Sequence, residues 1–250
     1  AGLNIGISWR GGRIESTIKS RSTPLLLWES VLKSGANFIN LQYGDCIEEI
    51  NQVKESLGVS INDWADADPL KDLDNFAAQI TALDLVISVD NSTVHFAGAL
   101  GTPVWVLLPY APEWRWFLHR DDSPWYPSVR LFRQKKLDAW ESVFEEVIKS
   151  LKLHDRQIQI TTDLTTLLTA TINAFRVNAI PEGHKKLIAL LELLASHTTM
   201  LSEEKVLKLK MLLNKILKEL EQKNYDAITE ILEKEIAPLL NLSLEKALLN

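Results

Sequence analysis

A run of small polar residues follows an apolar segment near the middle of the chain. The segment reads Leu-Val-Ile-Ser-Val at 85–89 and is typical of a strand buried on both faces. Polar or ionisable side chains then follow closely: Asp90, Asn91, Ser92, Thr93 and His95. Asn91 or Ser92 is a natural cap for a helix that begins near residue 93. N–H groups at such a helix start attract phosphate, so we expect an anion-binding turn, although a purely structural cap would use the same residue types.

A second candidate cluster follows the first apolar segment, at 3–9. Its basic side chains are Arg10, Arg13, Lys19 and Arg21, in a loop that contains two adjacent glycines. Cations aimed at a departing phosphate group stabilise the negative charge that develops on it. We expect Arg10 or Arg21 to make such a contact. The alternative is a solvated basic loop.

The elements that would position these residues alternate along the first 150 residues. Apolar runs predict strands at 3–9, 37–42, 59–62, 85–90, 103–109 and 129–132. Helices are predicted at 24–34, 47–57, 73–82, 93–100 and 139–153. This alternation predicts an α/β fold, a Rossmann-like parallel sheet with helices on both faces. Ligands bind such sheets at the carboxyl ends of the strands, where both polar clusters fall.

The composition changes after residue 150. All eight tryptophans lie at or before Trp140, and leucines at helical spacing dominate the remainder. We place a boundary in the polar stretch 152–160, which gives a Rossmann-like domain at 1–153 and an all-α helical bundle at 154–250. The bundle would pack against the sheet domain or form a homo-oligomer.

Charge and cysteine content exclude several classes of protein. The net charge is −6 without a Lys/Arg-rich run, so a nucleic-acid partner is not expected. The single cysteine, Cys46, cannot form an intrachain disulfide and favours a cytoplasmic location. No apolar run approaches the ~18 residues of a membrane span. The chain begins with Ala1 just before a strand, so we expect it to be a fragment or a processed chain.

Several ordered motifs resemble one family. Asp90-Asn-Ser-Thr-Val-His95, followed by Ala97-Gly-Ala-Leu-Gly-Thr-Pro103, resembles the signature of heptosyltransferase-like glycosyltransferases. It is most similar to the glycosyltransferase half of bacterial tetratricopeptide-repeat proteins. The stretches 5–12, 21–25, 68–79 and 112–127 also resemble that group, in the same order along the chain. The resemblance covers roughly residues 3–150 and not the tail.

The resemblance implies a fold and an activity. The chain would be the C-terminal, donor-binding half of a GT-B fold, and an N-terminal acceptor-binding half would come from a missing segment or a partner chain. It would bind a nucleotide-diphosphate sugar without a cofactor or metal and serve transfer to a glycan or protein acceptor. Alternatives are a GT-B-like epimerase and a non-catalytic Rossmann-like scaffold with a helical assembly module.

The resemblance also assigns residues. His95 corresponds to a histidine near the diphosphate, and the basic-loop residues Arg10 and Arg21 join it as catalytic candidates. Nucleotide-sugar contacts are assigned to Asp90, Asn91, Ser92, Thr93, Gln42, Tyr43 and Leu70. Heptosyltransferases more often carry Thr-Gly where Asn91 and Ser92 stand, which leaves the hydroxyl contacts at the sugar open.

Two further motifs are ambiguous. Asp66-Ala-Asp68 matches the D-x-D pattern of metal-dependent glycosyltransferases, but it precedes a predicted helix, and we expect a solvated loop there. The aromatic run between Trp114 and Tyr126 follows the fifth predicted strand. Its rings could stack on sugars and bases, close the sheet, or face the missing half.

Overall fold

The computed structural model describes residues 2–12, 15–198, 201–242 and 244. The chain divides into two compact units, Ala1–Leu153 and His154–Asn250.

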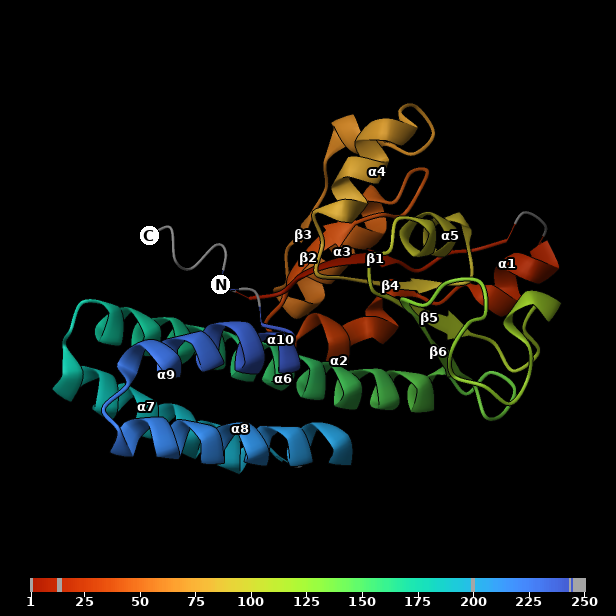
Figure 1. Ribbon diagram of the computed structural model, residues 1–250. Coiled ribbons are helices and arrows are strands. Elements are labelled where there is room, and N and C mark those ends of the chain that lie inside the picture. Colours follow the sequence, from red (N-terminus) through yellow and green to blue (C-terminus); the bar gives the residue numbers. More distant parts are fainter. Residues whose placement is uncertain (1, 13–14, 199–200, 243, 245–250) are drawn as a thin grey trace. The chain divides into compact units, whose positions relative to one another are not determined.

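A parallel sheet forms the centre of the first unit. Among the described residues it has six strands in the order β3-β2-β1-β4-β5-β6 (Figure 1). Their bounds are β1 Asn4–Ser8, β2 Asn37–Asn40, β3 Ile61–Asn62, β4 Leu85–Val89, β5 Val104–Leu108 and β6 Val129–Arg133. Strand addition reverses direction between β1 and β4, which is the Rossmann-like arrangement. The predicted α/β fold class is confirmed, and each predicted strand has its counterpart in the sheet.

Side chains alternate between two apolar layers, one on each face of the sheet. Ile5, Ile7 and Ile87 belong to one layer, together with the helices that cover that face. Val86 and Val106 belong to the other layer, with α4 and α5. Because both faces are covered, the strands are apolar at nearly every position, which explains their continuous hydrophobic runs.

Helices connect the strands and cover the two faces (Figure 1). Their bounds are α1 Glu15–Arg21, α2 Glu29–Leu32, α3 Ile47–Leu57, α4 Leu73–Thr81, α5 Ser92–Ala99 and α6 Trp140–Arg176. The predicted helix at 24–34 is a 3-10 turn, Leu25–Trp28, that continues into α2. Residues 15–21 were expected to lie in a loop but form α1, a helix that the sequence patterns did not predict.

The second unit packs its helices around one apolar cluster. After the end of α6 come α7 Ile180–Ser196, α8 Glu203–Glu221, α9 Tyr225–Ile231, a π turn at Leu232–Ile236 and α10 Ala237–Leu239. Ser202 caps α8 and Asn224 caps α9. Gly183 lies inside α7 against the ring of Phe175, where a Cβ would come within 2.5 Å of that ring.

The predicted end of a helix at residue 153 is wrong. Helix α6 runs without interruption from Trp140 to Arg176 and crosses the boundary between the units. The polar stretch 152–159 contains no Gly or Pro, and its lysine, arginine, leucine and glutamines are good helix formers. Polarity alone therefore did not mark the end of the helix.

The glycine of α5 allows one close packing contact. A Cβ at Gly98 would lie 2.6 Å from the ring of Tyr126. We predict that Gly98→Ala lowers the free energy of unfolding by about 1–3 kcal/mol, the usual cost of overpacking. Urea unfolding followed by tryptophan fluorescence reports on the first unit, because all eight tryptophans lie there.

The same substitution in a Tyr126→Ala background is the control. Removing the ring removes the clash, so Gly98→Ala should cost much less there. An equal loss in both backgrounds would contradict the packing argument.

Candidate functional site

A pocket of about 840 Å³ opens beyond the carboxyl ends of the strands. Every segment that contributes to it follows a strand of the sheet. Its lining residues are Gly12, Arg21, Tyr43, Pro69, Leu70, Leu73, Asp90, Asn91, Ser92, His95, Phe96, Glu113 and Arg115. It thus lies at the point where strand order reverses, the usual ligand position in such sheets.

Gln42, just beyond β2, holds the loop that leaves β1. Its Oε1 accepts hydrogen bonds from Ser8 Oγ at 3.1 Å, from Trp9 N at 2.9 Å and from Arg10 N at 2.7 Å. The Gln42 side chain is buried and is not among the pocket-lining residues. Its hydrogen bonds fix the conformation of the loop that leaves β1.

Asn91 fastens the same loop from the other side. Its Nδ2 donates to Ser8 Oγ at 2.7 Å and to the Arg10 carbonyl at 2.9 Å. Its Oδ1 accepts from Thr93 N at 2.9 Å, so Asn91 is the N-cap of α5, one of the two predicted caps. One amide therefore joins the β1 loop to the helix start at which anions are expected to bind.

Gly11 permits the loop to approach this turn. A Cβ at Gly11 would lie 2.7 Å from the carbonyl oxygen of Asp90. Any larger residue would press its Cβ against this backbone oxygen. The loop after β1 therefore packs directly against the turn after β4, and the two form a continuous surface.

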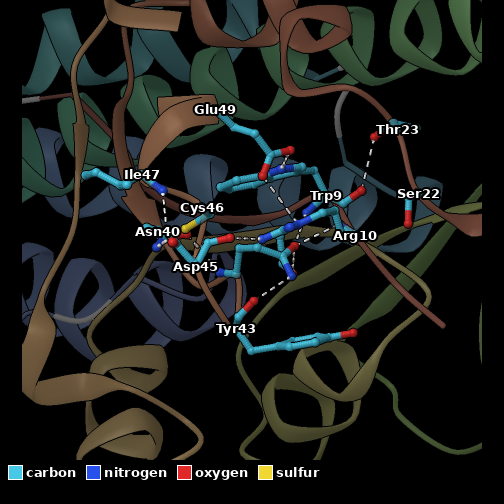
Figure 2. Close-up of polar contacts among 12 residues, drawn as sticks. Trp9, Arg10, Ser22, Thr23, Asn40, Tyr43, Asp45, Cys46, Ile47 and Glu49 are labelled. Atoms are coloured by element: carbon cyan, nitrogen blue, oxygen red, sulfur yellow. Dashed lines mark hydrogen bonds and ion pairs between the residues drawn. The ribbon is translucent and has the colours of Figure 1, made fainter. Parts of the chain in front are cut away.

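The guanidinium of Arg10 contacts the residues around the start of α3. It donates to the Asp45 carbonyl at 2.8 Å, and its Nε lies 3.4 Å from Glu49 Oε2. Trp9 donates its indole N–H to the same carboxylate at 2.8 Å (Figure 2). Arg10 does not line the pocket. Arg13 lies outside the described residues.

A chain of ion pairs surrounds the pocket. Arg21 lies 3.5 Å from Asp90 Oδ2 and also pairs with Glu113, which in turn pairs with Arg115 at 2.7 Å. The charged residues that line the pocket are thus two arginines and two carboxylates. Phosphate would bind the arginines, whereas carboxylates accept hydrogen bonds from hydroxyl groups.

Asp90 is a buried carboxyl, with 3% of its surface exposed. Burial raises its pKa above the ordinary 3.8, while the Trp116 indole and the Arg21 guanidinium act in the opposite direction. Among the described residues its Oδ2 has no hydrogen-bond donor, and the Arg21 guanidinium 3.5 Å away is its charged neighbour.

His95 holds Arg115 in place. Arg115 can only donate, so His95 Nε2, 3.1 Å from it, is the acceptor. In the neutral ring the proton then lies on Nδ1, which donates to the Tyr126 hydroxyl at 3.2 Å. The ring also stacks on Trp116, with centroids 5.5 Å apart. Burial, and next the Arg115 charge, lower the pKa of His95 and favour this neutral form.

The structure brings together most residues that the sequence analysis selected. Those that line the pocket are Arg21, Tyr43, Leu70, Asp90, Asn91, Ser92 and His95. Arg10, Gln42 and Thr93 do not line it, and Thr93 is buried. Glu113 was missed as a site residue because it lies in the loop five residues after the end of β5, whereas Asp90 directly follows β4.

The D-x-D pattern gives no metal site in the structure. Asp68 pairs with Lys71 at 3.1 Å, and the Leu70 N–H lowers its pKa. Among the described residues no group of three His, Cys, Asp or Glu side chains could hold a metal. In the same part of the chain, no helix is both long and apolar enough to cross a membrane.

Comparisons with known proteins assign no family to the chain, because no family model matches it. The chain is 41% identical over 152 residues to Protein FlbA of Caulobacter vibrioides. The aligned segment covers 60% of this chain and 25% of that protein. The chain thus corresponds to about a quarter of its relative's length. Glutamyl-tRNA reductase from Methanopyrus kandleri aligns over 93% of this chain and 58% of its own, at 12% identity and a TM-score of 0.25, a likeness that carries no argument.

The burial of Asp90 makes a prediction about pH. The pKa of Asp90 is higher in the folded protein than in the unfolded chain, so protonation of this carboxyl stabilises the fold. The stabilisation is complete below pH 3.8, the ordinary pKa, and is lost as pH rises through the folded pKa. Asp90→Asn stays neutral throughout. We expect this variant to be at least as stable as the wild type at neutral pH and to lack that decline, as measured by urea midpoints from about pH 4 to pH 8.

Asp74→Asn, an exposed change on α4, is the matched control and should leave the pH profile as it is. If Asp90→Asn instead lost stability at neutral pH and kept the wild-type slope, the attraction of Arg21 would outweigh burial.

Proposed function

We propose that the first unit binds a nucleotide-diphosphate sugar and acts as the donor-binding half of a metal-independent glycosyltransferase. The observation that supports it best is the pocket at the strand-order reversal, where Arg21, Arg115 and the start of α5 adjoin the buried carboxyl of Asp90. The resemblance of the segment 90–103 to glycosyltransferases agrees with this position.

The pocket combines the two kinds of group that such a donor requires. Arg21, Arg115 and the helix start suit a diphosphate, because cations and backbone N–H groups bind its oxygens. Asp90 and Glu113 suit sugar or ribose hydroxyls, since ionised carboxylates accept hydrogen bonds. Tyr43, Pro69 and Leu70 offer apolar surface for a base.

Sugar transfer expels a nucleoside diphosphate, and negative charge grows on the leaving oxygen. Groups that are already fixed in place stabilise this charge at the smallest reorganisation cost. Glu113 holds both arginines, and His95 holds Arg115 from its other side. In this proposal His95 is a positioning residue, and Arg21 and Arg115 take over the role of a metal.

The remaining parts of the proposal concern partners and location. The acceptor is a glycan or a protein, and an N-terminal half or a partner chain supplies part of the contacts to it. The buried Cys46 fits a cytoplasmic location.

Nucleotide binding is the direct test. We expect one member of a panel of ADP, UDP, GDP, CMP and their sugar conjugates to raise the melting temperature of the full chain, with or without EDTA. A ligand at a hundredfold excess over its dissociation constant adds about 2.7 kcal/mol of stability. Arg21→Gln should weaken binding about tenfold or more, through loss of a charged hydrogen bond.

Lys19→Gln, on the same helix but outside the pocket, should bind as the wild type does. A folded wild-type chain that responds to no nucleotide would reject the proposal for the isolated chain. A response abolished by EDTA would reject its metal-free part.

A second candidate function is a scaffold that assembles through its helical unit. Two observations favour it. The pocket arginines already have carboxylate partners within the chain. On α8, the side chains of Leu207 and Met211 are 63% and 66% exposed, one helical turn apart.

Assembly through α8 has its own test. If this face joins copies of the chain, light scattering after size exclusion should find a dimer or larger species for the wild type. Leu207→Glu with Met211→Glu should give monomers, because charge would enter an apolar contact. Lys208→Glu, exposed on the same helix, is the control. A monomeric wild type would rule this assembly out.

A further inference from the structure

The loop between β5 and β6 exposes large aromatic side chains outside the pocket. Trp114 and Trp125 are 74% and 52% exposed, and their ring centroids lie 6.4 Å apart with the planes at 90°. We call these two rings the tryptophan pair. Large exposed rings cost free energy in water, and a side-by-side arrangement on a surface is a sign of binding.

The backbone beneath the tryptophan pair is held from several sides. The indole N–H of Trp125 donates to the Arg115 carbonyl at 2.9 Å, and its backbone N–H donates to Ser123 Oγ at 3.2 Å. From β6, Arg133 donates to the Trp116 carbonyl. Phe117 has a φ of +52°, a conformation that is uncommon for such a residue. A held loop with exposed rings is preorganised to bind.

The tryptophan pair is connected to the pocket by sequence, because Trp114 lies between two residues that line it. Trp114 lies between Glu113 and Arg115, which both line the pocket and pair with each other. The next residue, Trp116, is buried and stacks on His95. Within the 3-10 turn Trp114–Trp116, the Trp114 ring is exposed, Arg115 lines the pocket and the Trp116 ring is buried.

We propose that the tryptophan pair binds a pyranose ring, and that this ring belongs to the acceptor of the transfer. The acceptor role rests on the proposed function; the binding of a sugar ring does not. The C–H face of a pyranose lies flat on an indole, and a second indole at a right angle limits the ring along one edge.

The polar surroundings favour a saccharide over a protein partner. Glu113 and Arg115 precede and follow Trp114 in the chain, and their charged groups line the adjoining pocket. A sugar that extends from the exposed ring toward the pocket would meet these groups, which can hydrogen-bond its hydroxyls. The core of a protein interface is depleted of carboxylates. Because the Trp125 indole N–H is already satisfied within the loop, its ring offers an apolar face.

The test uses the full chain labelled with 5-fluorotryptophan and followed by ¹⁹F NMR. Single Trp→Phe variants assign the signals of Trp114, Trp125 and Trp64. The probes are methyl pyranosides of glucose, galactose, mannose and N-acetylglucosamine, and their β-linked disaccharides. We expect at least one probe to shift the Trp114 and Trp125 signals in a saturable way and to leave Trp64 unchanged.

Substitutions then measure the contribution of each ring. Trp114→Ala and Trp125→Ala should each weaken the affinity for that probe by about tenfold. Trp64→Ala removes a half-exposed ring from a loop elsewhere and should have no effect. Nucleotide binding by Trp114→Ala should match the wild type, because Trp114 does not line the pocket.

The outcomes separate the two proposals. Sugar binding without any nucleotide response would overturn the donor-site proposal and leave the tryptophan pair as a sugar site. The proposal for the pair is overturned if no probe shifts its signals, or if Trp64 shifts equally. It is also overturned if the pair's signals change with protein concentration alone, which would assign this surface to self-association.

Discussion

Three hydrogen bonds to one amide oxygen fix the chain as it leaves the central strand. Gln42 Oε1 accepts from Ser8, Trp9 and Arg10, so the loop after β1 turns toward β2. Asn91 holds the same loop from β4 and caps α5. Without these contacts Gly11 would not lie against Asp90, and the two walls of the pocket would not meet. The side-chain amides of Gln42 and Asn91 therefore determine the shape of the pocket in which any chemistry would take place.

The pocket is a balanced electrostatic arrangement rather than a basic patch. Arg21 and Arg115 share Glu113, and Arg21 also approaches the buried Asp90. Such a network keeps the guanidinium groups in fixed positions at the cost of part of their attraction for anions. A phosphate that enters must share the arginines with Glu113. Selection among ligands would then depend on the hydroxyls that the two carboxylates accept.

The sheet and part of the site could be predicted from the sequence. Continuous apolar runs mark strands covered on both faces, and the carboxyl end of 85–90 places Asp90 and Asn91 correctly. Local patterns say nothing about which distant side chain a residue meets. Gln42 and Glu113 act across 32 and 92 positions of the chain, toward Arg10 and Arg21. Likewise, the predicted helix end at 153 is wrong because the helix propensity of residues 152–159 carries α6 through the boundary between the units.

Gly11 and Gly98 are both crowded, yet they constrain sequence change differently. The neighbour of Gly98 is the ring of Tyr126, so a smaller residue at 126 could make room for a side chain at 98. The neighbour of Gly11 is the carbonyl oxygen of Asp90, which every residue type at position 90 would also carry. Among descendants of this chain, positions 98 and 126 can therefore drift as a pair, whereas position 11 has no partner with which to covary.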